Sequence, residues 1–324
     1  MCWGARRVKM DLGILCRGKS IADDIKRTNP PAFRDYKRPD AWHLCADSIS
    51  YRRKDLTSNR KMDSKSLFDV KGKVALVTGG AKGIGRMISE GLVANGAKVY
   101  ISSRDEKACQ KAVEELNALP GGGSAHYIVA DFYKLESCQA LADELKKKET
   151  KLHILVNNSG SNWGETYDNY PDKAWVRVLT LNVQRVFTIT QLVTPLLEAA
   201  ATQYDPARII NIGSVDGIRT PKLETYAYSA SKAALHHMSE VLAHHLGQRN
   251  ITSNTIACGP FESKMMAETL KRFKSEIESA IPLNRIGTPE DVAGTVLFLS
   301  SRAGSYVNGA TITLDGGSVA AAKL

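Results

Sequence analysis

Short runs of apolar and β-branched residues alternate with longer stretches of helical period through most of the chain, and this alternation limits the fold more than any other feature. Seven such runs occur, each four to six residues long, the length of strands buried on both faces. Strands that alternate with helices form parallel sheets covered by helices on both sides. We therefore predict an α/β protein with one doubly wound, seven-stranded parallel sheet. The predicted strands are Val74–Thr78, Lys98–Ser102, Ala125–Ala130, Ile154–Asn157, Arg208–Ile212, Thr252–Ala257 and Thr311–Leu314.

The stretches between these runs predict six helices. The last helix has Thr288 as its N-cap, Pro289 at the first helical position, and Glu290 and Asp291 near the positive end of the helix dipole. The predicted helices are Arg86–Asn95, Glu106–Leu119, Leu135–Lys147, Asp172–Ala200, Tyr226–Gln248 and Pro289–Ser300.

The formal net charge of +10 belongs almost wholly to an N-terminal extension. Residues 1–61 hold 15 Lys and Arg against 7 Asp and Glu, whereas residues 62–324 hold 29 against 27. A nearly neutral body has no basic stripe for phosphate contacts, so we expect no nucleic-acid partner. The extension lacks a sustained period, and we expect it to be mostly disordered, either as a targeting arm or as an upstream segment joined to the gene in error. The compact domain is expected to span 62–324 and to open at Met62.

The sequence contains few signals that indicate a cellular compartment. No run approaches the ~18–20 consecutive apolar residues that cross a bilayer, and the N-terminus lacks the apolar core of a secretory signal. The 6 cysteines are widely spaced without a C-x-x-C pair, which favours a reducing compartment over a zinc ribbon or a disulfide framework. The chain ends in Ala322, Lys323 and Leu324, a close variant of the S-K-L peroxisomal signal. We therefore expect no membrane span, and either a peroxisomal address read by an import receptor or a cytoplasmic location.

A glycine-rich turn connects the first predicted strand to the first helix. Gly79, Gly83 and Gly85 follow Thr78 with the spacing G-x-x-x-G-x-G. Such glycines let backbone approach a pyrophosphate without a Cβ clash, and the helix that follows presents unpaired N–H groups to the anion. Glycines also make ordinary tight turns, but the position between strand and helix favours a dinucleotide site.

This turn and four later motifs together resemble the classical short-chain dehydrogenase/reductase family, from Lys73 to about Gly317. Within the family, the runs at 162–165, 224–232 and 259–266 resemble the 3-oxoacyl-carrier-protein reductases associated with rhamnolipid synthesis. The resemblance implies a Rossmann-type fold, a nicotinamide cofactor and a homotetramer. The motifs are Thr78-Gly79-(x)3-Gly83-Ile84-Gly85, Asn157-Asn158-Ser159-Gly160, Asn182, Ser214 and Tyr228-(x)3-Lys232.

The end of the second predicted strand indicates which nicotinamide cofactor binds. An NAD enzyme usually has a carboxylate there for the ribose 2′-hydroxyl, and Ser103 stands in its place. Arg104 can bind a 2′-phosphate through charge-assisted hydrogen bonds, and Lys82 in the glycine turn can add a second positive charge. The alternative is that both are solvated surface cations. We predict NADP(H).

The resemblance implies further cofactor contacts. Asp131 and Phe132 match the positions that flank adenine, although an Asp after a strand also caps helices. Two residues depart from the family pattern: Ser159 replaces the usual alanine, and Cys258 replaces a proline. The other implied contacts are Ile84, Asn158 and Gly160, and, for the carboxamide end, Pro260, Phe261 and Ser263.

Tyr228 and Lys232 are four residues apart, so one helix face presents both. A phenol with a pKa of about 10 is a poor proton donor at neutral pH, and a nearby ammonium stabilises its phenolate. We predict that Tyr228 protonates a carbonyl oxygen while Ser214 hydrogen-bonds the same atom. The resemblance implies that Lys232 also holds ribose hydroxyls and that Asn182 fixes a water in a proton relay. Tyr226, on a different helix face, is expected to line the pocket or to pack.

Three polar residues follow a helical stripe in the same segment. His236, Glu240 and His244 occur at i, i+4 and i+8 and could ligate a metal. The predicted reaction needs no metal, so we expect no metal site, and we expect these histidines at the helix surface or at an interface.

Apolar residues also recur at helical spacing between Phe261 and Ile286, interspersed with Lys271, Arg272 and Lys274. This is the substrate-loop region of the family. The stripe is explained either by packing or by a lid over an apolar substrate whose acidic carrier or phosphate lies near the basic residues. Its apolar residues are Met266, Leu270, Phe273 and Ile277.

These observations lead to a predicted function. We expect NADPH-dependent reduction of a carbonyl to a secondary alcohol, with a 3-oxoacyl thioester or a similar β-keto compound as substrate. The alternatives are an alcohol, sugar or secondary-metabolite dehydrogenase, a dienoyl-CoA reductase, and a non-catalytic NADP(H)-sensing regulator.

Overall fold

The computed structural model describes residues 62–321, so the predictions for residues 1–61 and for the C-terminal tripeptide at 322–324 lie outside the described residues. Its sheet has seven strands, all parallel, in the order β3-β2-β1-β4-β5-β6-β7. The chain therefore starts in the middle of the sheet, winds out to one edge, and returns to build the other half. The predicted doubly wound sheet is confirmed. The strands are β1 (Val74–Thr78), β2 (Lys98–Ser103), β3 (Ser124–Val129), β4 (Ile154–Asn157), β5 (Ala207–Ile212), β6 (Ile251–Cys258) and β7 (Thr311–Leu314).

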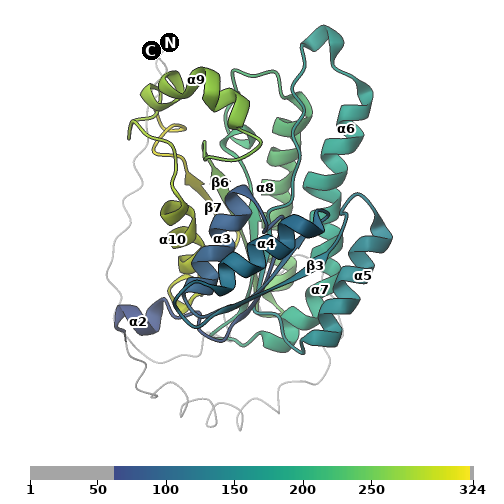
Figure 1. Cartoon of the computed structure of the whole chain (residues 1–324), viewed down its shortest axis with the longest axis vertical. Coiled ribbons are helices and arrows are strands. Elements are labelled where there is room, and N and C mark those ends of the chain that lie inside the picture. The colour runs from purple at the N-terminus through teal and green to yellow at the C-terminus, as the bar shows by residue number, and fades with distance from the viewer. Residues whose placement is uncertain (1–61, 322–324) are drawn as a thin grey trace, which may run out of the picture. The chain divides into compact units, whose positions relative to one another are not determined.

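Helices cover both faces of the sheet because successive strand residues point to opposite sides. Val77 and Ile101 join one buried apolar cluster, whereas Leu76 and Tyr100 join the other. The first cluster lies under α3 (Gly83–Ala94), α4 (Glu106–Asn117) and α10 (Pro289–Ser300). The second lies under α5 (Leu135–Lys148), α7 (Arg185–Ala200) and α8 (Tyr226–Gly247) (Figure 1).

Most predicted boundaries agree with the structure to within one or two residues, and one helix differs in kind. The stretch predicted as a single helix, 172–200, is α6 (Asp172–Leu179), a π-helical turn η5 (Thr180–Gln184) and then α7. Helix α3 starts three residues before the predicted Arg86, since the last two turn glycines already belong to it. A short helix, α2 (Ser64–Leu67), was not predicted.

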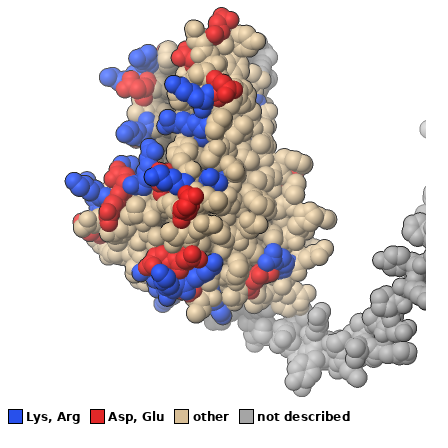
Figure 2. Space-filling view, turned by 90° about the vertical axis from the view of Figure 1, so that its right-hand side faces the viewer, with Lys and Arg blue, Asp and Glu red and all other residues tan. Residues whose placement is uncertain are grey.

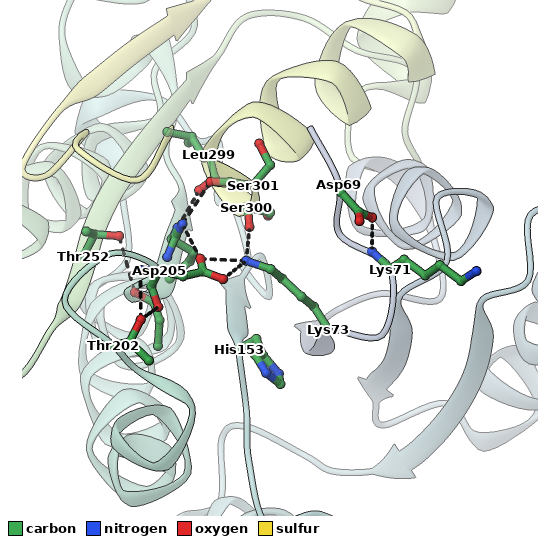
Figure 3. A network of polar contacts seen from close by, with 12 residues as sticks. Asp69, Lys71, Lys73, His153, Thr202, Asp205, Thr252, Leu299, Ser300 and Ser301 are labelled. Atoms are coloured by element: carbon green, nitrogen blue, oxygen red, sulfur yellow. Dashed lines mark hydrogen bonds and ion pairs between the residues drawn. The ribbon is translucent and has the colours of Figure 1, made fainter. Parts of the chain in front are cut away.

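Helix α10 is fixed at both ends. At its N-terminus the predicted cap is confirmed: Thr288 donates its backbone N–H to the Asp291 carboxylate at 2.8 Å, and Pro289 opens the helix. At its C-terminus, Lys73 Nζ donates to the Ser300 carbonyl at 3.1 Å and to Asp205 Oδ1 at 2.9 Å (Figure 3). Cations favour the negative end of a helix dipole, so this contact ties α10 to the start of β1.

The buried Arg208 completes this network at the start of β5. Its Nε and Nη2 atoms donate to the carbonyls of Leu299 and Ser301 at 3.0 and 2.9 Å. Nη2 also pairs with Asp205 Oδ1 at 2.9 Å, whereas Nη1 is buried without a partner in the described part of the chain. The Asp205 carboxylate thus pairs with both Lys73 and Arg208. This network lies at the edge of the sheet where the strands begin.

Charged side chains of both signs lie next to one another on the face shown in Figure 2, and no stripe of one sign crosses it. Within 62–321, no helix is both long enough and apolar enough to cross a membrane.

Candidate active site

The sequence-predicted site residues lie at or after the ends of β1 to β6, or on η5 and α8, and the carboxyl ends of these parallel strands meet at one edge of the sheet. The strand order reverses between β1 and β4, which is where open α/β sheets form their ligand crevice. The site is therefore built from loops at this edge, together with α8.

The glycine turn after β1 leaves no space for side chains at the positions predicted from its spacing. Gly79 and Gly83 have φ angles of 67° and 55°, in the left-handed region that favours glycine. A Cβ on Gly85 would lie 2.3 Å from the Gly79 carbonyl oxygen. With Ile84 in the first turn of α3, the loop brings bare backbone and free helix N–H groups to the crevice, and these fit a pyrophosphate.

Asn158 holds this turn against β4. Its side-chain nitrogen donates to the carbonyls of Thr78 and Gly79 at 2.9 and 3.3 Å. The Thr78 hydroxyl in turn accepts from the backbone N–H groups of Asn158 and Ser159 at 2.9 and 3.0 Å. Because Ser159 makes this contact through its backbone, its replacement of the family's alanine leaves the junction intact.

Tyr228 and Lys232 lie on α8, and Ser214 lies directly after β5, where it caps the 3-10 turn η6 (Val215–Gly217). Lys232 Nζ lies 5.6 Å from the centroid of the Tyr228 ring and donates to the Ile212 carbonyl at 2.7 Å. The structure thus brings together three of the four residues predicted to be catalytic, Ser214, Tyr228 and Lys232.

Burial controls the protonation of this group. It lowers the pKa of Lys232 to about 8. It also raises the pKa of Tyr228, and a hydrogen bond with Ser214 counteracts part of that rise. Burial raises the pKa of the nearby Cys258 thiol to about 12, so the thiol that replaces the family's proline is neutral. At neutral pH the site holds a phenol, a thiol and an ammonium.

Asn182 is buried in the π-helical turn η5, and its side chain faces the loop after β4. Its Oδ1 accepts from the Ser161 N–H at 2.8 Å, and its Nδ2 donates to the Ser161 carbonyl and to Ser231 Oγ, both at 2.9 Å. A Cβ on Gly160 would lie 3.3 Å from Asn182 Oδ1 and 3.8 Å from Lys232 Nζ. Asn182 therefore links the loop after β4, through Ser161, to Ser231 of α8. π-helical turns of this kind are frequent at functional sites.

The residues predicted to choose the cofactor differ in their surroundings. Arg104 is exposed, and within the described residues it makes no hydrogen bond or ion pair. Lys82 pairs with Asp105 Oδ2 at 2.6 Å, and Asp105 Oδ1 caps α4. Ser103 Oγ accepts from the Asp105 N–H at 3.3 Å. Asp105 was not among the predicted site residues, although its N-cap position before a predicted helix was a usable signal.

The two phenylalanines that were predicted beside the cofactor, Phe132 and Phe261, are both buried. Phe132 is packed in the buried cluster under α5, while Asp131 Oδ1 accepts from the Tyr133 N–H at 3.2 Å. Phe261 is also buried, and a Cβ on Gly287 would lie 2.3 Å from its ring. Contacts of Phe132 and Phe261 with a ligand are thus restricted to their main chains.

The loop after β6 lies over the glycine turn. A Cβ on Gly83 would lie 3.2 Å from Ser263 Cβ, so the loop that carries Pro260 and Ser263 contacts the glycine turn directly.

One predicted placement is wrong. His236 was expected at the helix surface or at an interface, but it is buried between α8 and the loop that carries Ser214. Glu240 and His244 are exposed, so the i, i+4, i+8 stripe does not converge. Between residues 62 and 321, no group of three or more His, Cys, Asp or Glu side chains is arranged to hold a metal ion.

Comparisons with known proteins agree with this architecture. The family model described as enoyl-(acyl carrier protein) reductase matches residues 79–319. The rhamnolipids biosynthesis 3-oxoacyl-[acyl-carrier-protein] reductase of Pseudomonas aeruginosa is 42% identical over 77% of this chain and 97% of its own. A 3-oxoacyl-[acyl-carrier-protein] reductase of Aquifex aeolicus is 34% identical over 76% of this chain and 98% of its own.

A solved structure, the RhlG/NADP active-site complex of Pseudomonas aeruginosa, superimposes with a TM-score of 0.76 at 40% identity, covering 78% of this chain and 99% of that one. The matched family model, the full-length relatives and the geometry of Ser214, Tyr228 and Lys232 lead to the same conclusion: the chain belongs to the short-chain dehydrogenase/reductase family of oxidoreductases.

Proposed function

We propose that the protein reduces a carbonyl to a secondary alcohol with NADPH, and that its substrate is a 3-oxoacyl thioester or a similar β-keto compound. The observation that carries the proposal is the convergence of Ser214, Tyr228 and Lys232 beside a glycine turn with no room for side chains. The relatives named as 3-oxoacyl reductases support the substrate class.

NADP(H) fits the residues of the crevice. Glycines leave bare backbone where a pyrophosphate would lie, and no carboxylate stands at Ser103. Arg104 is exposed and unpaired in the described structure, so it is available for a 2′-phosphate, whereas Lys82 already has Asp105 as a partner. We assign the role of phosphate reader to Arg104 and a secondary role to Lys82. The full proposed set for the cofactor is Gly79, Lys82, Gly83, Ile84, Gly85, Ser103, Arg104, Asp131, Phe132, Asn158, Gly160, Tyr228, Lys232, Pro260, Phe261 and Ser263.

In the proposed reaction, bound NADPH supplies the hydride for the carbonyl carbon. Tyr228 gives its phenolic proton to the carbonyl oxygen, and Ser214 donates a hydrogen bond to the same oxygen. The Lys232 ammonium, 5.6 Å from the Tyr228 ring, stabilises the phenolate that this transfer creates. Asn182 holds the loop after β4 in place beside Lys232, where it would also help to fix a relay water.

We favour carbonyl reduction over the enoyl reduction named in the family model's description. Ser214 and Tyr228 provide two donors for one oxygen atom, which in carbonyl reduction is the atom that takes the proton. The presence of the whole set, with Lys232, and the relatives named as 3-oxoacyl reductases support this choice. The same set disfavours a dienoyl-CoA reductase.

The segment after β6 supports an apolar acyl substrate. Helix α9 (Ala267–Ser279) buries none of its side chains, and its backbone departs from helical geometry at Phe273, which is half exposed. Figure 1 shows α9 lying at the end of the molecule that holds the carboxyl ends of the strands. An exposed, kinked amphipathic helix at this place suits a lid. Its Lys271 and Arg272 side chains are available to an acidic carrier or a phosphate, whereas Lys274 already pairs with Glu262 at 3.7 Å.

The test is a substrate panel with purified protein and either NADPH or NADH. The proposal expects turnover of 3-oxoacyl thioesters with NADPH. Turnover of polyols or sugar acids alone would instead favour the sugar-dehydrogenase alternative. The solved gluconate 5-dehydrogenase of Burkholderia cenocepacia is similar to this chain, at 27% identity and a TM-score of 0.74, over 80% of this chain and 100% of that one. Cofactor binding without turnover of any carbonyl compound or alcohol would favour the regulator.

We also propose a homotetramer. Val176, Leu179, Phe187 and Val241 are exposed apolar residues on α6, α7 and α8, where a second copy would cover them. Light scattering that gives the mass of a monomer at assay concentration would contradict this assembly.

A peroxisomal address remains part of the proposal and rests on residues 322–324. Deletion of Leu324 from an N-terminally tagged protein should turn punctate peroxisomal fluorescence diffuse without changing reductase activity. Diffuse fluorescence of the intact chain would leave the cytoplasm as the location.

A further inference from the structure

His236 is a buried polar residue that the proposed reaction does not use. It lies on α8 one turn after Lys232, and its side chain points toward the loop between β5 and η6. The backbone N–H of Ser214 donates to His236 Nε2 at 3.4 Å. A helix residue thus contacts the main chain of the proposed catalytic serine itself.

The imidazole also fits between the two glycines that flank the Ser214 turn. A Cβ on Gly213 would lie 2.3 Å from His236 Nε2, and a Cβ on Gly217 would lie 2.8 Å from His236 Cε1. No other residue type could occupy either glycine position without displacing the ring or the loop. The ring therefore determines the path of the main chain on both sides of Ser214.

The same contact requires a neutral ring. Because Nε2 accepts a hydrogen bond, the imidazole proton is on Nδ1. Burial, with the nearby Lys232 ammonium, lowers the pKa of His236 to about 4, and Glu240 opposes this only in part. The ring consequently acts as an acceptor throughout the neutral pH range.

The position of Ser214 depends on few other contacts. Gly213 donates its N–H to the Ile256 carbonyl of β6 at 2.8 Å, and the Ser214 hydroxyl accepts from the Asp216 N–H at 3.2 Å. The strand contact fixes the residue before the serine. The η6 turn holds the Ser214 hydroxyl and also the Ser214 carbonyl, which accepts from the Gly217 N–H at 3.0 Å. Among the side chains of the described residues, His236 is the one that accepts the Ser214 main-chain N–H.

We infer that His236 is a positioning residue, which accepts the Ser214 N–H and so aims the Ser214 hydroxyl at the carbonyl oxygen of the substrate. The inference rests on the proposed role of Ser214. It predicts that the acceptor atom of His236 is needed for turnover but not for cofactor binding.

The test compares three variants of the full chain. His236→Gln keeps an acceptor at similar reach, whereas His236→Leu fills much of the same space without one. His237→Leu is the matched control, since His237 is the next residue of α8 and is exposed, with Glu240 at 3.4 Å as its contact. Each variant is measured for kcat and KM with a ketone substrate, for NADPH affinity by fluorescence, and for Tm.

We expect His236→Leu to lower kcat about tenfold or more, because small displacements of a catalytic group are costly, while the Kd for NADPH changes less than about twofold. His236→Gln should recover kcat to within about threefold of the unmodified chain, and His237→Leu should match it. If His236→Leu does not fold, His236→Asn replaces it, because its shorter side chain keeps polarity but does not reach the Ser214 N–H.

Unchanged kcat in His236→Leu would overturn the inference, as would equal losses in the Gln and Leu variants, which would show that packing alone matters. Failure of the proposed function is separately visible: the unmodified chain would then not reduce the ketone, or Ser214→Ala would turn over at its full rate.

Discussion

Lys232 Nζ donates a 2.7 Å hydrogen bond to the carbonyl of Ile212, the last residue of β5. Ser214 follows two residues later, so this one contact fixes the spacing between the helix that carries Tyr228 and the strand that leads to Ser214. Both partners are buried, and a charged hydrogen bond in such surroundings is strong and directional. The proposed catalytic group is therefore pre-organised before any substrate binds.

Replacing Tyr228 by Phe should abolish most turnover and preserve the site. The variant loses the phenolic proton donor but keeps the ring, so we expect kcat to fall by a factor of ~10² or more. NADPH affinity, measured separately, should be nearly unchanged. Tyr226→Phe is the matched control, since Tyr226 is half exposed and its hydroxyl contacts Glu224. Full activity of Tyr228→Phe on an established ketone substrate would disprove the assignment of the proton donor.

Replacing Arg104 by Ala should weaken NADPH binding much more than NADH binding, because NADPH alone carries the 2′-phosphate. Loss of a charged hydrogen-bonded partner costs on the order of 1.5–3 kcal/mol, which corresponds to a 10- to 150-fold rise in Kd at about 25 °C. Lys82→Ala should have a smaller effect, because Lys82 is already paired with Asp105. Titrations with both cofactors check this, and equal losses for NADPH and NADH would show that Arg104 does not read the phosphate.

Because Lys232 is buried, we expect the free energy of unfolding to depend on pH. The pKa of this ammonium is about 8 in the folded protein and 10.5 in its ordinary state. Between these values the unfolded chain binds the extra proton, so the free energy of unfolding contributed by Lys232 rises with pH, by about 1 kcal/mol per pH unit. Below pH 8 both states are protonated and the burial penalty is constant.

Cofactor-free urea unfolding at pH 7, 8, 9 and 10 tests this prediction against Lys232→Met. The comparison is needed because the raised pKa values of Cys258 and Tyr228 act in the opposite direction at alkaline pH. We expect the stability difference between the two proteins to be flat from pH 7 to 8 and then to shift in favour of the unmodified chain. A difference that stays constant up to pH 10 would contradict the lowered pKa.

The sheet was predictable because buried parallel strands leave a strong signal: three of the seven strands match their predicted bounds to the residue. The turn around Gly83 and the pair Tyr228 and Lys232 were predictable because local spacing alone sets their geometry. The π-turn at Asn182 was not, because nothing in the helical period of 172–200 marks the single extra residue that turns Asn182 toward Ser161.

The burial of His236 could not be predicted from the sequence, for a different reason. Its environment is set by Gly213 and Gly217, more than 18 residues away in the chain, and only the folded loop creates the space that the imidazole fills. The Lys82–Asp105 pair is similar, since it joins two loops that the parallel pairing of β1 and β2 brings together. Contacts between loops that lie far apart in the sequence cannot be predicted from the periodic pattern of apolar residues, because that pattern is local.

Asp205 should be a key residue for stability although it lies far from the catalytic group. Asp205→Ala leaves the buried guanidinium of Arg208 and the ammonium of Lys73 without a counter-charge. Removing one partner of a fully buried pair costs about 3–5 kcal/mol, and since Asp205 is partly exposed we expect about 2 kcal/mol or more. Denaturant unfolding measures the loss. Asp143→Ala, which removes a surface pair with Lys146, should cost about 0.5 kcal/mol or less, and equal losses would refute the special role of Asp205.

A chain shortened to start at Met62 should fold and turn over substrate as the full chain does. Within the described residues, the seven strands, both buried clusters and every residue of the proposed site lie after Met62, and α2 is capped by Asp63, which the shortened chain keeps. The extension carries most of the net positive charge, so its removal should alter solubility and ion-exchange behaviour rather than kcat. Tm, kcat and NADPH affinity of the two chains, compared at equal concentration, test this boundary. A lower Tm or a loss of turnover in the shortened chain would mean that residues 1–61 are part of the folded enzyme.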